Sequence, residues 1–223
     1  GTHGRPWLSP AGTDLYLSLL LDPARYAASL PQLTLAAGLA LSRTCGPLVD
    51  TQANLQLKWP NDLYLAGRKC AGVLIEARQE AEGLQPLVLG IGLNVNRQHF
   101  PAPLADSATS LRKHLRQPAP PWYCRHSEHG WQLKRATVLA QLLRQLEIAL
   151  HCLTTPTGSA QVVQAVQQRL RWRGERVRCG GAEGRLVGLA PDGALMLDSG
   201  AGGLLTCYSG HVTLCGDSEE NGS

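Results

Sequence analysis

The chain has 223 residues, of which 43% are hydrophobic, and it carries a formal net charge of +4 at pH 7. This length accommodates one catalytic domain of ordinary size with a small appendage, and the hydrophobic content is enough for a buried core. Lys and Arg are scattered rather than massed, so the charge indicates neither a nucleic-acid partner nor an anionic membrane. The apolar runs are too short for a membrane span and no signal peptide is expected, which predicts a cytoplasmic protein.

The cysteines also favour a reduced, cytosolic setting. They form no Cys-x-x-Cys pair and no zinc-like cluster, so no metal site is predicted. Their odd number argues against a complete disulfide framework. Cys70 follows Lys69, but we expect an inert strand residue there rather than a reactive thiol. The seven cysteines are Cys45, Cys70, Cys124, Cys152, Cys179, Cys207 and Cys215.

The first part of the chain reads as a loop, a strand and a helix. Residues 1–12 are rich in Gly and Pro, which indicates a mobile loop. Residues 15–21 are almost continuously apolar, which predicts a buried strand. A helix is expected over residues 30–45, because Pro31 stands in its first turn and Gly46-Pro47 follows its last residue.

A series of hairpins is expected next. A short strand at residues 55–57 leads to Pro60, and a turn at residues 66–68 separates two apolar runs. This arrangement would place Lys69 on the returning strand, opposite Asn61 and Asp62. Further strands are predicted up to residue 77 and over residues 87–94, so the sheet should be antiparallel or mixed.

The remaining chain divides into helices and short strands. Residues 97–121 should be irregular apart from a brief helix near Leu111, and helices are predicted over residues 133–153 and 159–170. The apolar stripe of the first helix is Leu139, Leu142, Leu143, Leu146 and Leu150. Short strands with glycine turns over residues 175–214 predict a small barrel. We therefore expect a catalytic domain at 1–172, a second domain at 173–215 and a disordered tail at 216–223.

One segment places polar residues inside strand-like sequence. It reads Leu57-Lys58-Trp59-Pro60-Asn61-Asp62 and then Gly67-Arg68-Lys69-Cys70-Ala71-Gly72-Val73-Leu74-Ile75-Glu76. Taken singly, Asn61 and Asp62 would only shape a turn, Lys69 would be a solvated lysine and Trp59 would fill a core. Together, the residues resemble the K-W-P-N-D and R-K-x-x-G-[IV]-L-x-E signature of biotin protein ligases.

Two further stretches carry the same resemblance. Gly1-Thr2-His3-Gly4-Arg5-Pro6-Trp7-Leu8-Ser9-Pro10-Ala11-Gly12 is similar to the family's glycine-rich loop, and Leu89-Gly90-Ile91-Gly92-Leu93-Asn94 is similar to its G-[IA]-G-[IL]-N strand. The resemblance implies an α+β fold of the class II aminoacyl-tRNA synthetase/biotin synthetase type. In it, helices pack on a mixed or antiparallel sheet, and residues 172–214 form a C-terminal SH3-like β-barrel.

The resemblance implies an activity and a set of site residues. The activity is ATP-dependent formation of biotinyl-5′-AMP, with Mg²⁺, followed by transfer of biotin to a lysine of a biotin carboxyl carrier protein domain of acetyl-CoA carboxylase or a related carboxylase. Lys69 would be the catalytic cation and Asp62 a proton acceptor or orienting group. Ligand binding would fall to Gly1, Thr2, His3, Gly4, Arg5, Trp7, Lys58, Asn61, Gly72, Gly90, Gly92 and Asn94.

Several alternatives stay open. The family carries, before its glycine loop, a strand with a Ser-Thr pair and a glutamine that bind biotin; this chain lacks them, through truncation or genuine loss. Two other functions are possible for the chain: a lipoate ligase-like acyl-adenylate transferase, or a non-catalytic remnant that binds carrier or adenylate. A homodimer is also possible. There is no helix-turn-helix, so no DNA-binding role is predicted.

Overall fold

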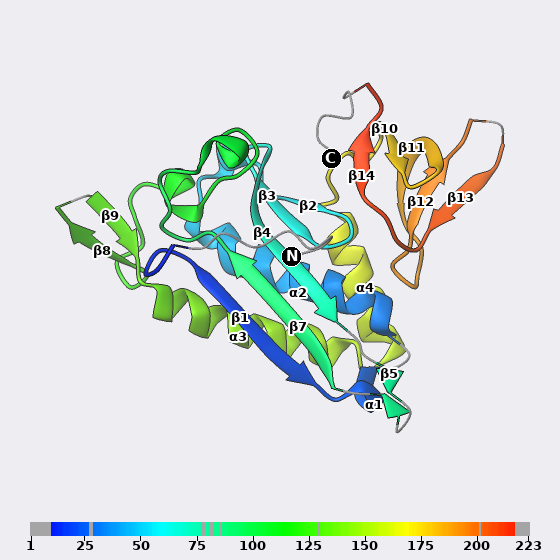
Figure 1. Cartoon of the computed structure of the whole chain (residues 1–223), viewed down its shortest axis with the longest axis horizontal. Helices are drawn as coiled ribbons and strands as arrows, with labels where there is room; N and C mark the ends of the chain where they lie inside the picture. Colours follow the sequence, from blue (N-terminus) through cyan, green and yellow to red (C-terminus); the bar gives the residue numbers. More distant parts are fainter. Residues whose placement is uncertain are drawn as a thin grey trace.

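The computed structural model describes residues 10–26, 29–76, 79–80, 83–84, 86–128, 130–200 and 202–216. Its centre is a five-stranded sheet in the order β1-β7-β4-β3-β2, in which every neighbouring pair is antiparallel (Figure 1). The strands are β1 (Leu15–Leu21), β2 (Gln56–Lys58), β3 (Asp62–Leu65), β4 (Arg68–Glu76) and β7 (Leu87–Leu93). Of the two predicted arrangements, antiparallel or mixed, the antiparallel one is confirmed, and a strand does occupy residues 15–21. The predicted burial of this strand is wrong, because β1 is an edge strand and none of its residues is fully buried.

Three helices cover one face of this sheet, behind it in Figure 1. They are α2 (Leu30–Cys45), α3 (Arg135–Cys152) and α4 (Pro156–Gln167), and a short α1 (Pro23–Tyr26) follows β1. β1 shows the consequence, because its odd-numbered leucines are half-buried while Tyr16, Ser18 and Leu20 are exposed. Alternate strand residues point to opposite faces, so the face of Tyr16 is open at this edge.

The helices begin and pack somewhat differently from the sequence pattern. α2 has the predicted bounds, whereas α4 begins at Pro156 because the Thr155 hydroxyl caps it by accepting from the Gly158 amide at 3.2 Å. In α3 the predicted burial of Leu143 is wrong, since its side chain is 41% exposed. The buried residues of α3 are Val138, Leu142, Leu146, Ala149 and Leu150.

The connections hold several short elements. The brief helix expected near Leu111 is the 3₁₀-helix Leu111–His114. A hairpin of β8 (Cys124–Ser127) and β9 (Gly130–Leu133), which the sequence pattern did not predict, projects beside the start of α3 (Figure 1). The other short elements are the 3₁₀-helices Gly46–Leu48, Thr51–Ala53 and Ala102–Leu104, and the small strands β5 (Gln79–Glu80) and β6 (Gly83–Leu84).

The C-terminal strands form a second five-stranded antiparallel sheet, separate from the first (Figure 1). It contains β10 (Arg176–Cys179), β11 (Ala182–Leu189), β12 (Leu195–Asp198), β13 (Leu204–Cys207) and β14 (Val212–Leu214). The Trp59 indole donates to the Gly193 carbonyl at 3.0 Å, and the Gln32 amide donates to the Pro191 carbonyl at 2.8 Å. The turn at residues 190–194 is therefore pinned to both α2 and the Lys-Trp-Pro-Asn-Asp segment.

All seven cysteines are free thiols, and Cys70 is fully buried. Burial raises the pKa of the Cys70 thiol well above its ordinary value, so it fits the inert strand residue that was expected. No helix in the described ranges is long and apolar enough to span a bilayer.

Candidate active site

A row of facing residues crosses the sheet on the side away from the helices. The register pairs Tyr16 with Gly92, Gly92 with Gly72, Gly72 with Asp62, and Asp62 with Lys58. Residues that face one another in an antiparallel sheet project to the same side. The row thus has bare backbone at its centre and charged side chains at the β3 and β2 end.

Gly90 extends the bare region by one row. It pairs with Ser18 on one side and Leu74 on the other, two residues along from Gly92 and Gly72. We call Gly72, Gly90 and Gly92 the glycine patch. Gly72 and Gly90 are half-buried and Gly92 is buried. Three glycines on adjacent strands leave this part of the sheet without side chains of its own, and glycine within a strand often marks a place where a ligand approaches closely.

Lys69 and Asp62 form an ion pair beside this patch. The Lys69 ammonium lies 2.7 Å from Asp62 Oδ1, and the two side chains are 34% and 10% exposed. The expected placement of the Lys69 backbone opposite Asn61 and Asp62 is wrong, because a bulge after Leu63 pairs Lys69 with Tyr64. The long Lys69 side chain makes up for this shift in register, so its ammonium still reaches the Asp62 carboxylate.

The Lys69 backbone is held on its other side as well. Its amide donates to the Ser107 carbonyl at 2.8 Å, and its carbonyl accepts from the Thr109 amide at 2.9 Å. Lys69 is therefore fixed between β3 and the segment that includes Ala108. This bracing limits the freedom of a long, flexible side chain and orients its ammonium.

Gly72 provides the space that the ion pair occupies. A Cβ atom at this position would lie 3.2 Å from Lys69 Cε, 3.3 Å from Lys69 Nζ and 3.3 Å from Asp62 Oδ1. These separations are tighter than ordinary carbon contacts. The Lys69 ammonium consequently lies over Gly72, on the same face of the sheet as Gly90.

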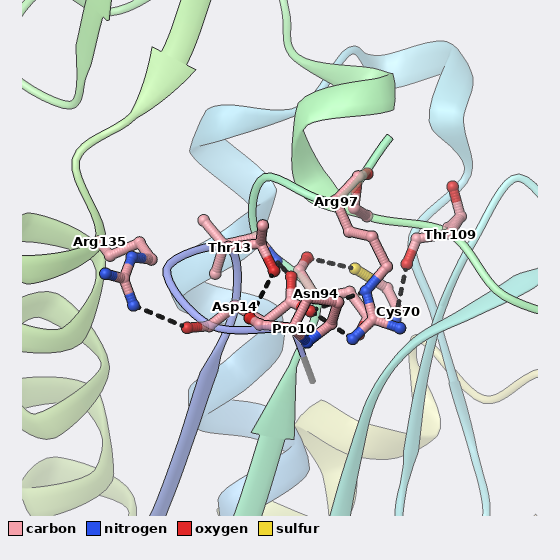
Figure 2. Close-up of polar contacts among 10 residues, drawn as sticks. Pro10, Thr13, Asp14, Cys70, Asn94, Arg97, Thr109 and Arg135 are labelled. Atoms are coloured by element: carbon pink, nitrogen blue, oxygen red, sulfur yellow. Dashed lines mark hydrogen bonds and ion pairs between the residues drawn. The ribbon is translucent and has the colours of Figure 1, made fainter. Parts of the chain in front are cut away.

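Asn61 and Asn94 bond to backbone carbonyls. The Asn61 side-chain amide donates to the Val73 carbonyl at 2.7 Å, and the Asn61 main-chain carbonyl accepts from the Val73 amide at 2.9 Å. Asn94 is buried and donates to the Thr109 carbonyl at 2.9 Å, while the Cys70 thiol points to the Asn94 carbonyl (Figure 2). Both asparagines thus secure the segments that carry Lys69 and the glycine patch.

A buried ion pair at the start of β1 was missed by sequence reasoning. Asp14 Oδ2 lies 2.6 Å from one Arg97 guanidinium nitrogen and accepts a hydrogen bond from another at 2.8 Å (Figure 2). Asp14 Oδ1 accepts from the Val95 amide at 3.0 Å. Each residue is only 4% exposed, and the pair ties β1 to the end of β7. In the sequence, the one signal for this ion pair is an acidic residue directly before an apolar strand.

Lys58 lies between the first sheet and the C-terminal sheet. Its ammonium stands 5.0 Å from the centre of the Trp172 ring and 3.2 Å from His211 Nε2, and the residue is 6% exposed. Burial lowers the pKa of Lys58 to about 8, although the Asp62 carboxylate partly opposes the shift. The Arg171 guanidinium stacks on the same Trp172 ring at 4.8 Å. Lys58, Lys69 and Arg171 thus give the region around Asp62 an excess of positive charge.

The remaining predicted residues lie outside the described ranges. They are Gly1, Thr2, His3, Gly4, Arg5 and Trp7. Within the described ranges, no group of three or more His, Cys, Asp or Glu side chains could hold a metal ion. The assembled groups are therefore a cation, a carboxylate and a bare backbone surface, an arrangement suited to binding an anionic ligand.

Comparisons with known proteins identify the family. A biotin--[acetyl-CoA-carboxylase] ligase of Mycobacterium tuberculosis is 34% identical over 211 residues, which cover 90% of this chain and 69% of that protein. The chain belongs to the biotin protein ligase family. The model of the Biotin/lipoate A/B protein ligase family matches residues 1–94, which include Lys58, Asp62, Lys69 and the glycine patch.

Solved structures of the family share the fold. The biotin protein ligase of Aquifex aeolicus in complex with biotin and ATP superimposes with a TM-score of 0.76 at 30% identity, over 95% of this chain and 82% of that one. The bifunctional ligase/repressor BirA of Bacillus subtilis is 38% identical over 113 residues. The match covers 50% of this chain and 34% of that protein, so the chain spans about a third of this relative's length.

Proposed function

We propose that the chain carries the chemistry of its family, namely ATP-dependent formation of biotinyl-5′-AMP and transfer of biotin to a lysine of a biotin carboxyl carrier protein. The observation that carries the proposal is the Lys69–Asp62 ion pair lying over Gly72. The sequence around it carries the family's signature, and the relative in complex with biotin and ATP has the same fold. The glycine patch then serves as the floor on which the ligand lies.

In the first step, a carboxylate of biotin attacks the α-phosphate of ATP and pyrophosphate leaves. Both reactants are anions, so the site must supply positive charge where it accumulates in the transition state. A single cation about 4 Å from an oxygen is worth roughly 4 kcal/mol at an effective dielectric constant of about 20. That corresponds to at most about three decades of rate, because the ground state is also charged.

Asp62 keeps Lys69 in position for this step. The ion pair orients the ammonium over Gly72, and the neighbouring Lys58 and Arg171 leave the region with net positive charge despite the carboxylate. The Lys69 ammonium has three N–H donors, so an incoming phosphate oxygen would accept a hydrogen bond from one that Asp62 does not use. Lys69 can therefore hold Asp62 and the phosphate at the same time.

In the second step, the ε-amine of the carrier lysine attacks the acyl carbon and AMP leaves. The amine must be neutral to attack, and it loses a proton as the amide forms. Asp62 is the carboxylate nearest to the glycine patch in the register of the sheet, so we assign it to orient the amine or accept the proton. Mg²⁺ would enter with the phosphates of ATP, since the described side chains do not form a resident metal site.

The proposal includes two domains. Residues 1–172 would bind biotin and ATP, and residues 173–215 would support that domain through the Trp59 and Lys58 contacts described above. The carrier domain would approach the open face of the first sheet, because α2, α3 and α4 cover the other.

The test is a pair of assays on the chain together with whatever residues its gene encodes before Gly1. Biotin-dependent exchange of pyrophosphate into ATP measures adenylate formation, and incorporation of biotin into a carrier domain measures transfer. The proposal expects both activities with biotin and neither with lipoate. Exchange with lipoate alone would make the protein a lipoate ligase, and binding of carrier without exchange would make it a non-catalytic relative.

A further inference from the structure

A second basic site lies at the end of the sheet, beyond the start of β1. It is a cavity of about 310 Å³ between the turn before β1, strand β9 and the first turn of α3. Four cationic side chains line it, and the described lining residues include no carboxylate. The cations are Arg112, Arg125, Lys134 and Arg135. Lys69, Asp62 and the glycine patch are absent from this lining.

The walls of the cavity are fixed by hydrogen bonds. The Asn96 side chain bonds to Leu133 in both directions, donating to its carbonyl and accepting from its amide at 2.9 Å each. Arg135 reaches from α3 to the Asp14 carbonyl at 3.1 Å, as Figure 2 shows. These bonds hold β9 and α3 against the end of the sheet. The cavity is thus preformed, as binding sites for small ligands generally are.

The charged side chains that line the cavity in the described ranges are all cationic. Lys134 and Arg135 stand at the N-cap and first residue of α3, and the first turn of this helix contains no acidic residue. Cations at the positive end of a helix repel its dipole, whereas an anion there is stabilised. Arg125, Lys134 and Arg135 donate hydrogen bonds to neutral oxygens of Gln132, Pro121 and Asp14, respectively. Like charges gathered around one cavity raise the local concentration of anions.

We infer that this cavity binds a small polyanion with linked phosphate groups, at a site separate from Lys69. Linked phosphates match several guanidinium and ammonium donors at once, and arginine binds phosphate oxygens in a bidentate manner. β1 and β4 are two strand spacings apart, roughly 10 Å, so the two sites are neighbours but do not share side chains. The inference does not depend on the proposed ligase activity.

The test follows backbone amides in ¹⁵N-labelled protein during titration with pyrophosphate. In the wild type, the amides of Gln132, Leu133 and Ala136 should shift saturably. In the double variant R125Q/K134Q the dissociation constant should rise about tenfold, since two exposed charge contacts are lost. Both side chains are exposed, so the substitutions should leave the fold intact. Titration with ADP distinguishes a nucleotide phosphate chain from free pyrophosphate.

Two controls separate this site from others. R43Q/R144Q removes the same charge from exposed positions on α2 and α3 outside the cavity, and it should bind like the wild type. Lys69→Ala should also leave the shifts at Gln132 and Ala136 unchanged, whether or not the protein is a ligase. Unsaturable shifts in the wild type, equal affinity in R125Q/K134Q, or loss of the shifts in Lys69→Ala would each overturn the inference.

Discussion

Lys69 and Asp62 meet at 2.7 Å although they are not paired in the hairpin that joins them. The bulge after Leu63 sets Lys69 against Tyr64, and the long side chain returns over Gly72 to reach the carboxylate. The site therefore depends on a glycine as much as on its two charged residues. Because each of the three positions touches the others, substitutions should have coupled effects.

Gly72→Ala should impair chemistry more than stability. The added methyl group would lie 3.2 Å from Lys69 Cε and 3.3 Å from Asp62 Oδ1, so the flexible ammonium must move by a few tenths of an ångström. We expect the free energy of unfolding to change by less than about 1 kcal/mol and kcat for adenylate formation to fall about tenfold. Urea unfolding and pyrophosphate exchange measure the two effects. Unchanged exchange would show that the position of the ion pair is not critical.

Gly90→Ala should weaken substrate binding without disturbing the protein. In the free protein its Cβ would meet only ordinary contacts, 3.7 Å from the Leu74 carbonyl oxygen and 3.8 Å from Leu74 Cβ. If the glycine patch is the floor of the site, the methyl group would occupy space needed by ligand, and the KM for biotin should rise about tenfold. Gly46→Ala, where a Cβ meets nothing within 4 Å, is the matched control. Equal KM values for biotin in Gly90→Ala and Gly46→Ala would show that the glycine patch is not part of the binding site.

Lys58→Met should alter how stability depends on pH. Burial lowers the pKa of Lys58 from 10.5 to about 8, so between pH 8 and 10.5 the unfolded chain binds a proton that the folded chain has lost. This group therefore makes the folded protein more stable as pH rises through that window. Lys58→Met lacks this contribution, so its free energy of unfolding minus that of the wild type should decrease by on the order of 1 kcal/mol between pH 7.5 and 9.5.

Urea unfolding at the two pH values measures this change for Lys58→Met. Lys113→Met, which replaces an exposed lysine, controls for the loss of one positive charge. A constant difference between Lys58→Met and the wild type across both pH values would mean that Lys58 keeps an ordinary pKa in the folded state.

Asp14→Ala should be strongly destabilising. It would leave the Arg97 guanidinium, which is 4% exposed in its side chain, without its carboxylate, and the Val95 amide without its acceptor. Removing one partner of a buried pair typically costs about 3–5 kcal/mol. Chemical denaturation measures the loss, with the exposed Asp106→Ala as the control. A change below about 1 kcal/mol in Asp14→Ala would show that the pair contributes little to joining β1 and β7.

Local pattern predicted the fold well, and long-range pairing limited the prediction of the site. The strand Leu15–Leu21 and the helix Leu30–Cys45 are marked by apolar periodicity and by proline or glycine at their ends. The ion pair of Asp14 with Arg97 joins residues 83 positions apart, and neither neighbourhood contains a signal for its partner. The register of Lys69 depends on a bulge that no residue type specifies. Leu143 fits the helical stripe, yet its side chain is 41% exposed.

The contact between the two parts of the chain was also hidden in the sequence. Trp59 and Lys58 stand inside the motif that indicated chemistry, yet their side chains reach Gly193, Trp172 and His211. Trp59 is 5% exposed and fills a core, as expected of it when taken singly, whereas Lys58 was expected only among the ligand-binding residues. Neither a lysine at the end of a strand nor a tryptophan in the turn after it gives information about a partner more than 100 residues away.

The central claim is that the Lys69 ammonium offsets negative charge at the α-phosphate, and Lys69→Ala tests it most directly. Pyrophosphate exchange and single-turnover transfer from biotinyl-5′-AMP should be measured side by side, with thermal melting and Lys69→Arg as controls. Exchange should fall by about one to three decades, transfer should fall less because its acyl group is already activated, and melting should change little. Unaltered exchange together with a sharp drop in melting temperature would show that Lys69 is a structural residue and would contradict the account.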